Sequence, residues 1–418
     1  MIKRNLPLMI TLAVFVLGYL YCLTQFPGFA STRVICNILT DNAFLGIIAV
    51  GMTFVILSGG IDLSVGSVIA FTGVFLAKAI GFWGISPLVA FPLVLVMGCA
   101  FGAFMGLLID ALKIPAFIIT LAGMFFLRGV SYLVSEESIP INHPVYDALS
   151  GLAWTIPGGG RLSAMGLLML LVVIGGIFMA HRTRFGNQVY AIGGNATSAN
   201  LMGISTRSTT IRIYMLSTGL ATLAGIVFSI YTQAGYALAG VGVELDAIAS
   251  VVIGGTLLSG GVGTVLGTLF GVGIQGLIQT YINFDGTLSS WWTKIAIGIL
   301  LFIFIALQRG LTVLWENRQS SPVTRVGHCL ENFPSRTAGG EEARYASGNS
   351  LIKFSTSSTI WLLPTKKERR WCRLSGMISR IRSLPSLALP PACSARNAIG
   401  LHSYSRRSLP SGWLAVLG

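Results

Sequence analysis

The sequence lacks the residue patterns by which many proteins bind ATP, zinc or a disulfide partner. Its 418 residues contain no Gly-Lys dipeptide, which a phosphate-binding loop of the Gly-x-x-x-x-Gly-Lys-Ser/Thr type requires. The six cysteines show no Cys-x-x-Cys spacing and form no metal-ligand pattern with the four histidines. The spans show no paired carboxylates and no nucleophile beside a base. We therefore expect no catalytic residues, no metal and no cofactor bound by this chain.

Charge is also scarce. Only 10% of the residues are charged and 53% are hydrophobic, whereas soluble domains are about 25% charged, so an ordinary soluble domain is excluded. The net charge of +14 would by itself suggest nucleic-acid binding. Residues 1–326, however, hold 15 basic and 10 acidic residues, and residues 327–418 hold 13 and 4. Because most of the excess lies in the C-terminal part, we expect no nucleic-acid partner.

Long apolar segments fill the rest of the chain. A helix rises 1.5 Å per residue and the hydrocarbon layer is about 30 Å thick, so roughly 20 apolar residues make one crossing. The sequence predicts an all-α, polytopic membrane protein with about ten transmembrane helices, the eighth being short. The segment between residues 135 and 160, with its prolines and glycines, is expected to be an irregular surface loop. The predicted spans are 6–26, 43–58, 64–82, 86–108, 115–134, 162–181, 211–232, 246–258, 262–283 and 288–308.

The distribution of basic residues predicts how the spans are oriented. Lysine and arginine are retained in cytoplasmic loops, and most of them fall in the connections on the side of the N-terminus. An even number of spans then places both termini of this multi-pass protein in the cytoplasm.

Glycines within the spans are regularly spaced. Gly98, Gly102 and Gly106 lie four residues apart, as do Gly263, Gly267 and Gly271, so each trio occupies one helix face. Such faces allow two helices to approach closely in a membrane. They indicate either static packing or an interface that slides during transport.

A short pattern occurs twice, 201 residues apart. Residues 57–60 and 258–261 both read Leu-Ser-Gly-Gly, and each is followed at the same spacing by Gly-Ser or Gly-Thr. Duplicated breaks in apolar helices indicate a transport pathway. An alternative for the first break is an ordinary cytoplasmic turn in which Asp62 or Ser64 caps the next helix. The candidate pathway or gate residues are Gly59, Gly60, Asp62, Ser64 and Gly66.

Few ionisable residues lie inside the spans. Arg128 and Lys294 do, and neither has an acidic partner at helical spacing. Ion-driven transport normally uses buried ionisable groups, so their scarcity gives only weak support to ion coupling. An ion-coupled secondary transporter of a small polar solute is the alternative function.

The internal loop from residue 181 to residue 212 combines arginines with a short, partly apolar helix. Asn195 is expected to cap this helix, which would run to about Ile204. An exposed helix of this kind can dock into a groove on a partner. From the residues alone, docking and a solvated loop are equally well supported.

At this loop the chain resembles the permeases of ribose-type sugar ABC importers. The matching runs include residues 59–67, 114–129, 186–204 and 245–261, and the resemblance extends over about residues 1–325, where it is closest to a permease subunit of a galactofuranose importer. It implies a transmembrane permease that does no chemistry itself. It also implies an ATPase subunit that uses ATP, a periplasmic sugar-binding protein, a second permease copy or sister permease, and surrounding lipid. The implied ATPase-coupling residues are Gly186, Ala191, Gly193, Asn195, Leu201, Met202, Gly203 and Ile204.

The remaining residues, 326–418, form a basic tail without helical or strand periodicity. We expect this tail to be disordered or to be a translated alternative frame, because the resemblance ends abruptly where the tail begins.

Overall fold

The structure is a computed structural model that describes residues 6–289, 291–319, 352–354 and 358–360. It divides into two units, Met1–Arg309 and Gly310–Gly418. Most of the predicted tail lies outside the described residues. The elements are α1 (Leu6–Gln25), the 3-10 turn η2 (Pro27–Ala30), α2 (Thr32–Asp41), α3 (Ala43–Leu57), α4 (Val65–Gly81), α5 (Pro87–Leu112), α6 (Ala116–Val134), β1 (Ile139–Pro140), α7 (Pro144–Gly151), β2 (Ala153–Ile156), β3 (Gly160–Ser163), α8 (Ala164–Arg182), α9 (Arg184–Gly194), α10 (Ala196–Leu201), α11 (Thr206–Thr232), β4 (Ala234–Gly235), α12 (Val243–Ile253), α13 (Val265–Asp285), α14 (Trp291–Gln319), β5 (Ile352–Phe354) and β6 (Ser358–Ile360).

The first unit confirms the predicted helical, multi-span architecture, but fewer helices are long enough to cross a membrane. In the described part of the chain, seven helices have the required length and composition, and the pair α2 and α3, bent by 57°, makes an eighth if it is one span. The predicted spans 64–82 and 246–258 correspond to α4, with 17 residues, and α12, with 11. Both lie beside the Leu-Ser-Gly-Gly breaks, and these breaks are the reason that they are short.

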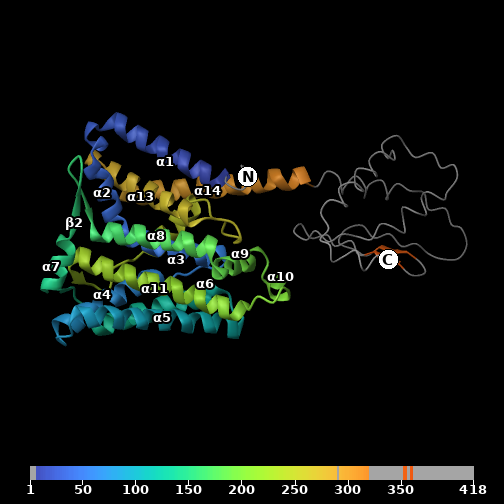
Figure 1. Ribbon diagram of the computed structural model, residues 1–418, viewed down its shortest axis with the longest axis horizontal. Helices are drawn as coiled ribbons and strands as arrows, with labels where there is room; N and C mark the ends of the chain where they lie inside the picture. The colour runs from blue at the N-terminus through green and yellow to red at the C-terminus, as the bar shows by residue number, and fades with distance from the viewer. Residues whose placement is uncertain (1–5, 290, 320–351, 355–357, 361–418) are drawn as a thin grey trace, which may run out of the picture. The chain divides into compact units, whose positions relative to one another are not determined.

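The two ends of the bundle carry different structures. The helices α9 and α10 lie at one end, and α7 with the β2–β3 hairpin lies at the other (Figure 1). The prediction of an irregular loop between residues 135 and 160 is therefore wrong in part, because the segment contains α7 and β2. His143 Nδ1 accepts a hydrogen bond from Val145 N (3.2 Å) at the start of α7, and the turn of the hairpin contains Gly158 and Gly159, both with positive φ.

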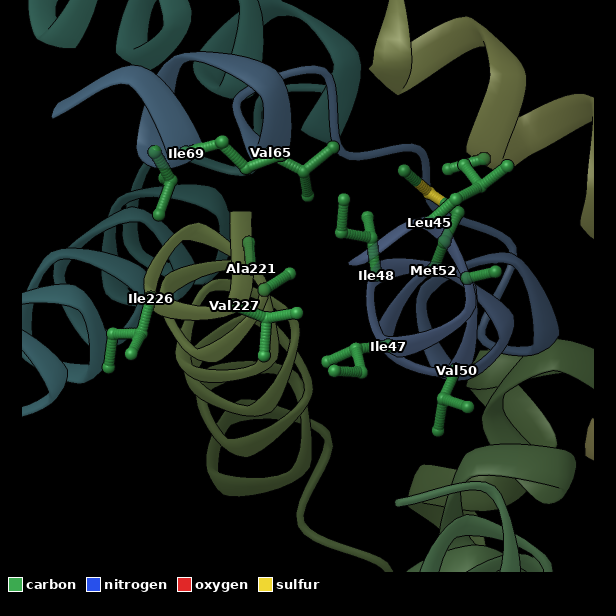
Figure 2. Close-up of a cluster of buried hydrophobic side chains, with 14 of the residues drawn as sticks. Leu45, Ile47, Ile48, Val50, Met52, Val65, Ile69, Ala221, Ile226 and Val227 are labelled. Carbon is green, nitrogen blue, oxygen red and sulfur yellow. The ribbon is translucent and has the colours of Figure 1, made fainter. Parts of the chain in front are cut away.

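The core is built around α3, α4 and α11. All residues of α3 except Phe44 are buried, which is the behaviour of a helix that is apolar on every side. Outer helices instead expose apolar side chains, such as Leu88 on α5 and Leu133 on α6, as expected for lipid-facing surfaces. Figure 2 shows side chains of the core helices facing one another, among them Ile47, Ile48, Met52, Val65, Ile69, Ala221 and Val227.

The first glycine trio packs against a neighbouring helix, as do Gly267 and Gly271 of the second. Gly263 precedes α13 and faces Thr256, so its predicted place on the same helix face is wrong. A Cβ added at Gly106 would lie 2.7 Å from the Cα of Ile211 on α11, and Gly98 and Gly102 face α11 in the same way. In the second trio, Gly271 faces the Ser250 carbonyl of α12. The predicted close approach of helices is confirmed, whereas sliding along these faces stays a prediction.

Candidate functional site

The two Leu-Ser-Gly-Gly segments lie directly against each other. Gly261 N donates a hydrogen bond to the Leu57 carbonyl oxygen (2.8 Å). A Cβ added at Gly260 would lie 2.8 Å from Gly59 N, which leaves no room for a side chain. Gly59, Gly260 and Gly261 all have positive φ, a conformation that glycine adopts without steric cost. The repeat seen in the sequence is therefore a pair of helix breaks in backbone contact.

A third segment, the end of α9, contacts both breaks. A Cβ added at Gly193 would overlap the Leu57 carbonyl oxygen and would lie 2.6 Å from Gly261 N. Nearby, Tyr190 Oη donates to the Gly263 carbonyl oxygen (2.8 Å). We call the contact of residues 57–60, 193–194 and 260–261 the glycine junction. It brings the predicted coupling loop and the predicted pathway breaks together.

Asp62 is fully buried next to the first break. Its Oδ1 accepts hydrogen bonds from Ser64 N (2.9 Å) and Ser64 Oγ (2.6 Å). Its Oδ2 accepts from Ser217 Oγ of α11 (2.8 Å). Ser64 occupies the N-cap position of α4, but its side chain makes no capping hydrogen bond, so capping by Ser64 is wrong, whereas Asp62 does accept the backbone N–H of this N-cap residue. Asp62 instead ties the break to α11.

The other two candidate gate glycines face polar side chains. A Cβ added at Gly60 would overlap Tyr214 Oη, and one at Gly66 would overlap the Glu244 carboxylate. Neither Tyr214 Oη nor Glu244 Oε2 has a hydrogen-bond partner among the described residues. The broken helix therefore places its glycines where α11 and the start of α12 present polar groups.

The coupling segment forms two short helices, α9 and α10. Thr183 Oγ1 accepts from Gly186 N (3.2 Å) at the start of α9, where Gly186 packs against the end of α8. Asn195 Oδ1 accepts from Ser198 N (2.9 Å), so the predicted N-cap is confirmed. Ala191 is half-buried on α9.

The far end of α10 is apolar and exposed. Leu201 and Met202 are 77% and 70% exposed, whereas Ala199 of the same helix is buried. Gly203 follows with φ of +84°, and Ile204 N donates to the Ala199 carbonyl oxygen (3.1 Å). Two large apolar side chains thus project from the end of the bundle on a helix that is anchored on its other side.

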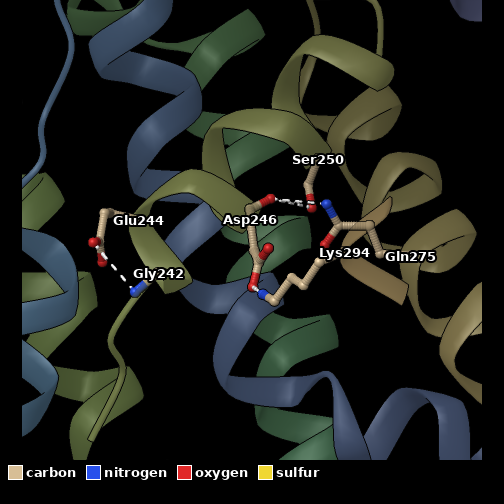
Figure 3. A network of polar contacts seen from close by, with 6 residues as sticks. All are labelled: Gly242, Glu244, Asp246, Ser250, Gln275 and Lys294. Carbon is tan, nitrogen blue, oxygen red and sulfur yellow. Dashed lines mark hydrogen bonds and ion pairs between the residues drawn. The ribbon is translucent and has the colours of Figure 1, made fainter. Parts of the chain in front are cut away.

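Arg128 and Lys294, which lack partners at helical spacing, have partners elsewhere in the chain. Lys294 Nζ pairs with the Asp246 carboxylate, and the Asp246 carbonyl oxygen accepts from Gln275 Nε2 (3.0 Å) and Ser250 Oγ (2.9 Å) (Figure 3). Arg128 Nη1 donates to backbone carbonyl oxygens more than 100 residues away in the sequence. The contacts of Lys294 and Arg128 could not be found from spacing because they join segments far apart in the sequence.

The described residues contain no group of three or more His, Cys, Asp or Glu side chains that could hold a metal ion. The candidate site consists of the glycine junction and of the side-chain hydrogen bonds beside it.

Comparison with known proteins identifies the family. Residues 34–305 match a family model described as a branched-chain amino acid transport system permease component. The chain belongs to this permease family. It is 95% identical over 326 residues to the inner membrane ABC transporter permease protein YjfF of Escherichia coli (strain K12), covering 78% of this chain and 98% of that protein.

Two further relatives of this permease are named as sugar importers. The ribose import permease protein RbsC of Escherichia coli (strain K12) is 39% identical over 68% of this chain and 88% of its own length. The fructose import permease protein FruG of Bifidobacterium longum (strain NCC 2705) is 34% identical over 76% and 94%. These relatives confirm the predicted membership of the ribose-type sugar permeases. No solved structure matches the chain.

Proposed function

We propose that this permease forms half of the pore of an ATP-driven importer in the bacterial inner membrane and that it carries galactofuranose. A periplasmic binding protein would deliver the sugar, and a separate ATPase subunit would bind at the cytoplasmic side, where we propose that both termini lie. A second copy or a sister permease would complete the pore. The proposal is supported by the family, by the relatives named as sugar permeases, and, for galactofuranose, by the resemblance of residues 1–325.

The observation that carries this proposal is the glycine junction. A displacement of α9 and α10 by a bound ATPase would act directly on both helix breaks, because Gly193 touches Leu57 and Gly261 through backbone atoms. Alternating access requires that a signal at one end of the bundle changes the pathway within it. Backbone contact between the docking segment and two breaks at corresponding places provides such a connection.

Reconstitution of the complex tests the proposed function. The permease, its ATPase and its binding protein are placed in liposomes, and ATP hydrolysis and sugar uptake are measured. We expect galactofuranose-loaded binding protein to stimulate both, and ribose-loaded binding protein of another importer to stimulate neither. Uptake driven by a proton or sodium gradient without ATP would contradict the importer and favour a secondary transporter.

A charge at Leu201 tests the docking helix. Leu201→Glu places a carboxylate on a side chain that is 77% exposed, so folding should be unaffected while an apolar groove on the ATPase would have to bury the charge. Burial of an unpaired charge costs several kcal/mol, and we expect at least a tenfold loss of ATPase co-purification. Leu201→Met is the matched control. Equal ATPase recovery with both variants would exclude α10 from docking.

A further inference from the structure

The chain between α11 and α12 enters the bundle as irregular backbone. After the short strand β4, residues 236–242 form consecutive turns until α12 begins at Val243. Gly235 packs against Gly73 in the middle of α4, and Gly240 packs against Gly66 at the start of that helix. We call residues 236–242 the irregular stretch.

The irregular stretch lies beside α4, far from the end of that helix at Gly81. The helix α4 ends at Gly81 and is followed by the exposed aromatic residues Phe82 and Trp83, which are typical of a membrane interface. Gly66 lies 15 residues before Gly81, a distance of about 22 Å along a helix. Since the hydrocarbon layer is about 30 Å thick, an α4 that runs along the membrane normal places Gly240 inside this layer.

Arg128 of α6 and Glu244 of α12 hold the irregular stretch in place. Arg128 Nη1 donates hydrogen bonds to the carbonyl oxygens of Ala237 (2.7 Å) and Ala239 (2.8 Å). Glu244 interacts electrostatically with Arg128, and its Oε1 accepts from Gly242 N (3.3 Å) (Figure 3). An arginine at this depth is costly unless it has a function, and here it satisfies two carbonyl groups that no helix satisfies.

The other side of the irregular stretch is not covered by any of the residues that the structure describes. Leu238 and Val241 are 43% and 63% exposed, and their backbone N–H groups donate to no acceptor among the described residues. Tyr236 is exposed as well. Irregular backbone at membrane depth is tolerated only where it is buried in protein or lines a water-filled cavity. Free N–H donors beside an aromatic ring favour water and a neutral sugar, which has both hydroxyl groups and apolar faces.

We propose that the irregular stretch is a water-exposed wall of the sugar pathway and that Arg128 is the residue that positions it. The proposal rests on the proposed function as a sugar permease. It adds the location of the pathway: the sugar passes the face formed by Tyr236, Leu238 and Val241. A second permease subunit would then lie across the pathway from this face and would not be packed onto it.

Thiol labelling tests this wall independently of transport. In membranes from cells that express the complex with all native cysteines of the permease replaced, single cysteines are introduced at Leu238, Val241 and, as a control, Phe302. Phe302 is 74% exposed within the apolar α14. The charged reagent 2-sulfonatoethyl methanethiosulfonate reacts only in water. We expect Leu238→Cys and Val241→Cys to react at least tenfold faster than Phe302→Cys.

The outcomes separate this proposal from the proposed function. The proposal of a water-exposed wall would be overturned by labelling rates equal to that of Phe302→Cys. It would also be overturned if Val241→Cys formed oxidative cross-links between two permease subunits in place of labelling. Fast labelling in a complex that hydrolyses no ATP in response to sugar would leave the wall intact and contradict the proposed function.

Two substitutions at Arg128 test its positioning role. Arg128→Met removes the donor to both carbonyl groups, and we expect labelling at Val241→Cys to change at least fivefold while Trp83→Cys outside α4 keeps its rate. Arg128→Lys keeps a cationic donor and should restore labelling at Val241→Cys towards its original rate. Unchanged labelling in Arg128→Met would remove Arg128 from this role.

Discussion

Gly193→Ala is expected to abolish the response of the ATPase to sugar-loaded binding protein. The added Cβ would overlap the Leu57 carbonyl oxygen, and the neighbouring Gly261 N is 2.6 Å away. Because both neighbours are backbone atoms, no rotamer change can relieve the overlap and α9 must leave the glycine junction. Overpacking typically costs about 1–3 kcal/mol, and about 1.4 kcal/mol corresponds to a tenfold change in rate. We therefore expect at least a tenfold loss of sugar-stimulated ATP hydrolysis and of uptake in liposomes.

The adjacent glycine provides a matched control. A Cβ added at Gly194 meets no atom within 4 Å, so Gly194→Ala should retain both activities. Co-purification of the ATPase is measured in parallel, and it should persist in Gly193→Ala because Leu201 and Met202 stay exposed. Equal uptake by the two variants would show that the glycine junction does not transmit movement of α9 to the two helix breaks.

Asp62→Ala is expected to cause a large loss of stability. The fully buried carboxylate accepts three hydrogen bonds, from Ser64 N, Ser64 Oγ and Ser217 Oγ. Without it, a break between two helices loses its connection to α11 and leaves buried donors without acceptors. Each buried group left unsatisfied costs about 1–3 kcal/mol. We expect a total of about 3 kcal/mol, measured as a lower midpoint of thermal unfolding of the purified permease in detergent.

Two control variants are expected to lose less stability than Asp62→Ala. Ser217→Ala removes one of the three hydrogen bonds and should cost about 1 kcal/mol. Asp147→Ala removes an exposed carboxylate at the other end of the bundle and should cost less than about 0.5 kcal/mol. An Asp62→Ala protein that unfolds at the same temperature as Asp147→Ala would show that these hydrogen bonds do not hold the break in place.

The sequence was sufficient to predict features that depend on local patterns. Apolar length predicted most of the spans, the position of Asn195 predicted the start of α10, and the glycine spacing predicted helix faces in close contact. The 201-residue offset also identified both helix breaks. Apart from the repeat, which a comparison of the two halves of the sequence reveals, each of these features is encoded within a few consecutive turns of one helix.

Features that depend on contacts between distant segments could not be predicted. Arg128 had no partner at helical spacing because its acceptors lie on the irregular stretch, which the apolar pattern had assigned entirely to a connection. The role of Gly193 was equally hidden, since nothing near it in the sequence shows that Leu57 and Gly261 flank it. The predicted span for the short α12 began three residues too late and ended five residues too late, because apolar content does not distinguish turns from helix at membrane depth.

The backbone composition of the glycine junction determines how it can move. A contact between side chains gives way gradually, since each side chain has several rotamers to absorb a small displacement. At the glycine junction a carbonyl group meets an amide group directly, with no rotatable bond between the contact and the main chain. A small displacement of one backbone segment therefore cannot be absorbed by side-chain rotation. We expect the two breaks, joined by this hydrogen bond, either to move together or to separate, which would give the glycine junction two positions.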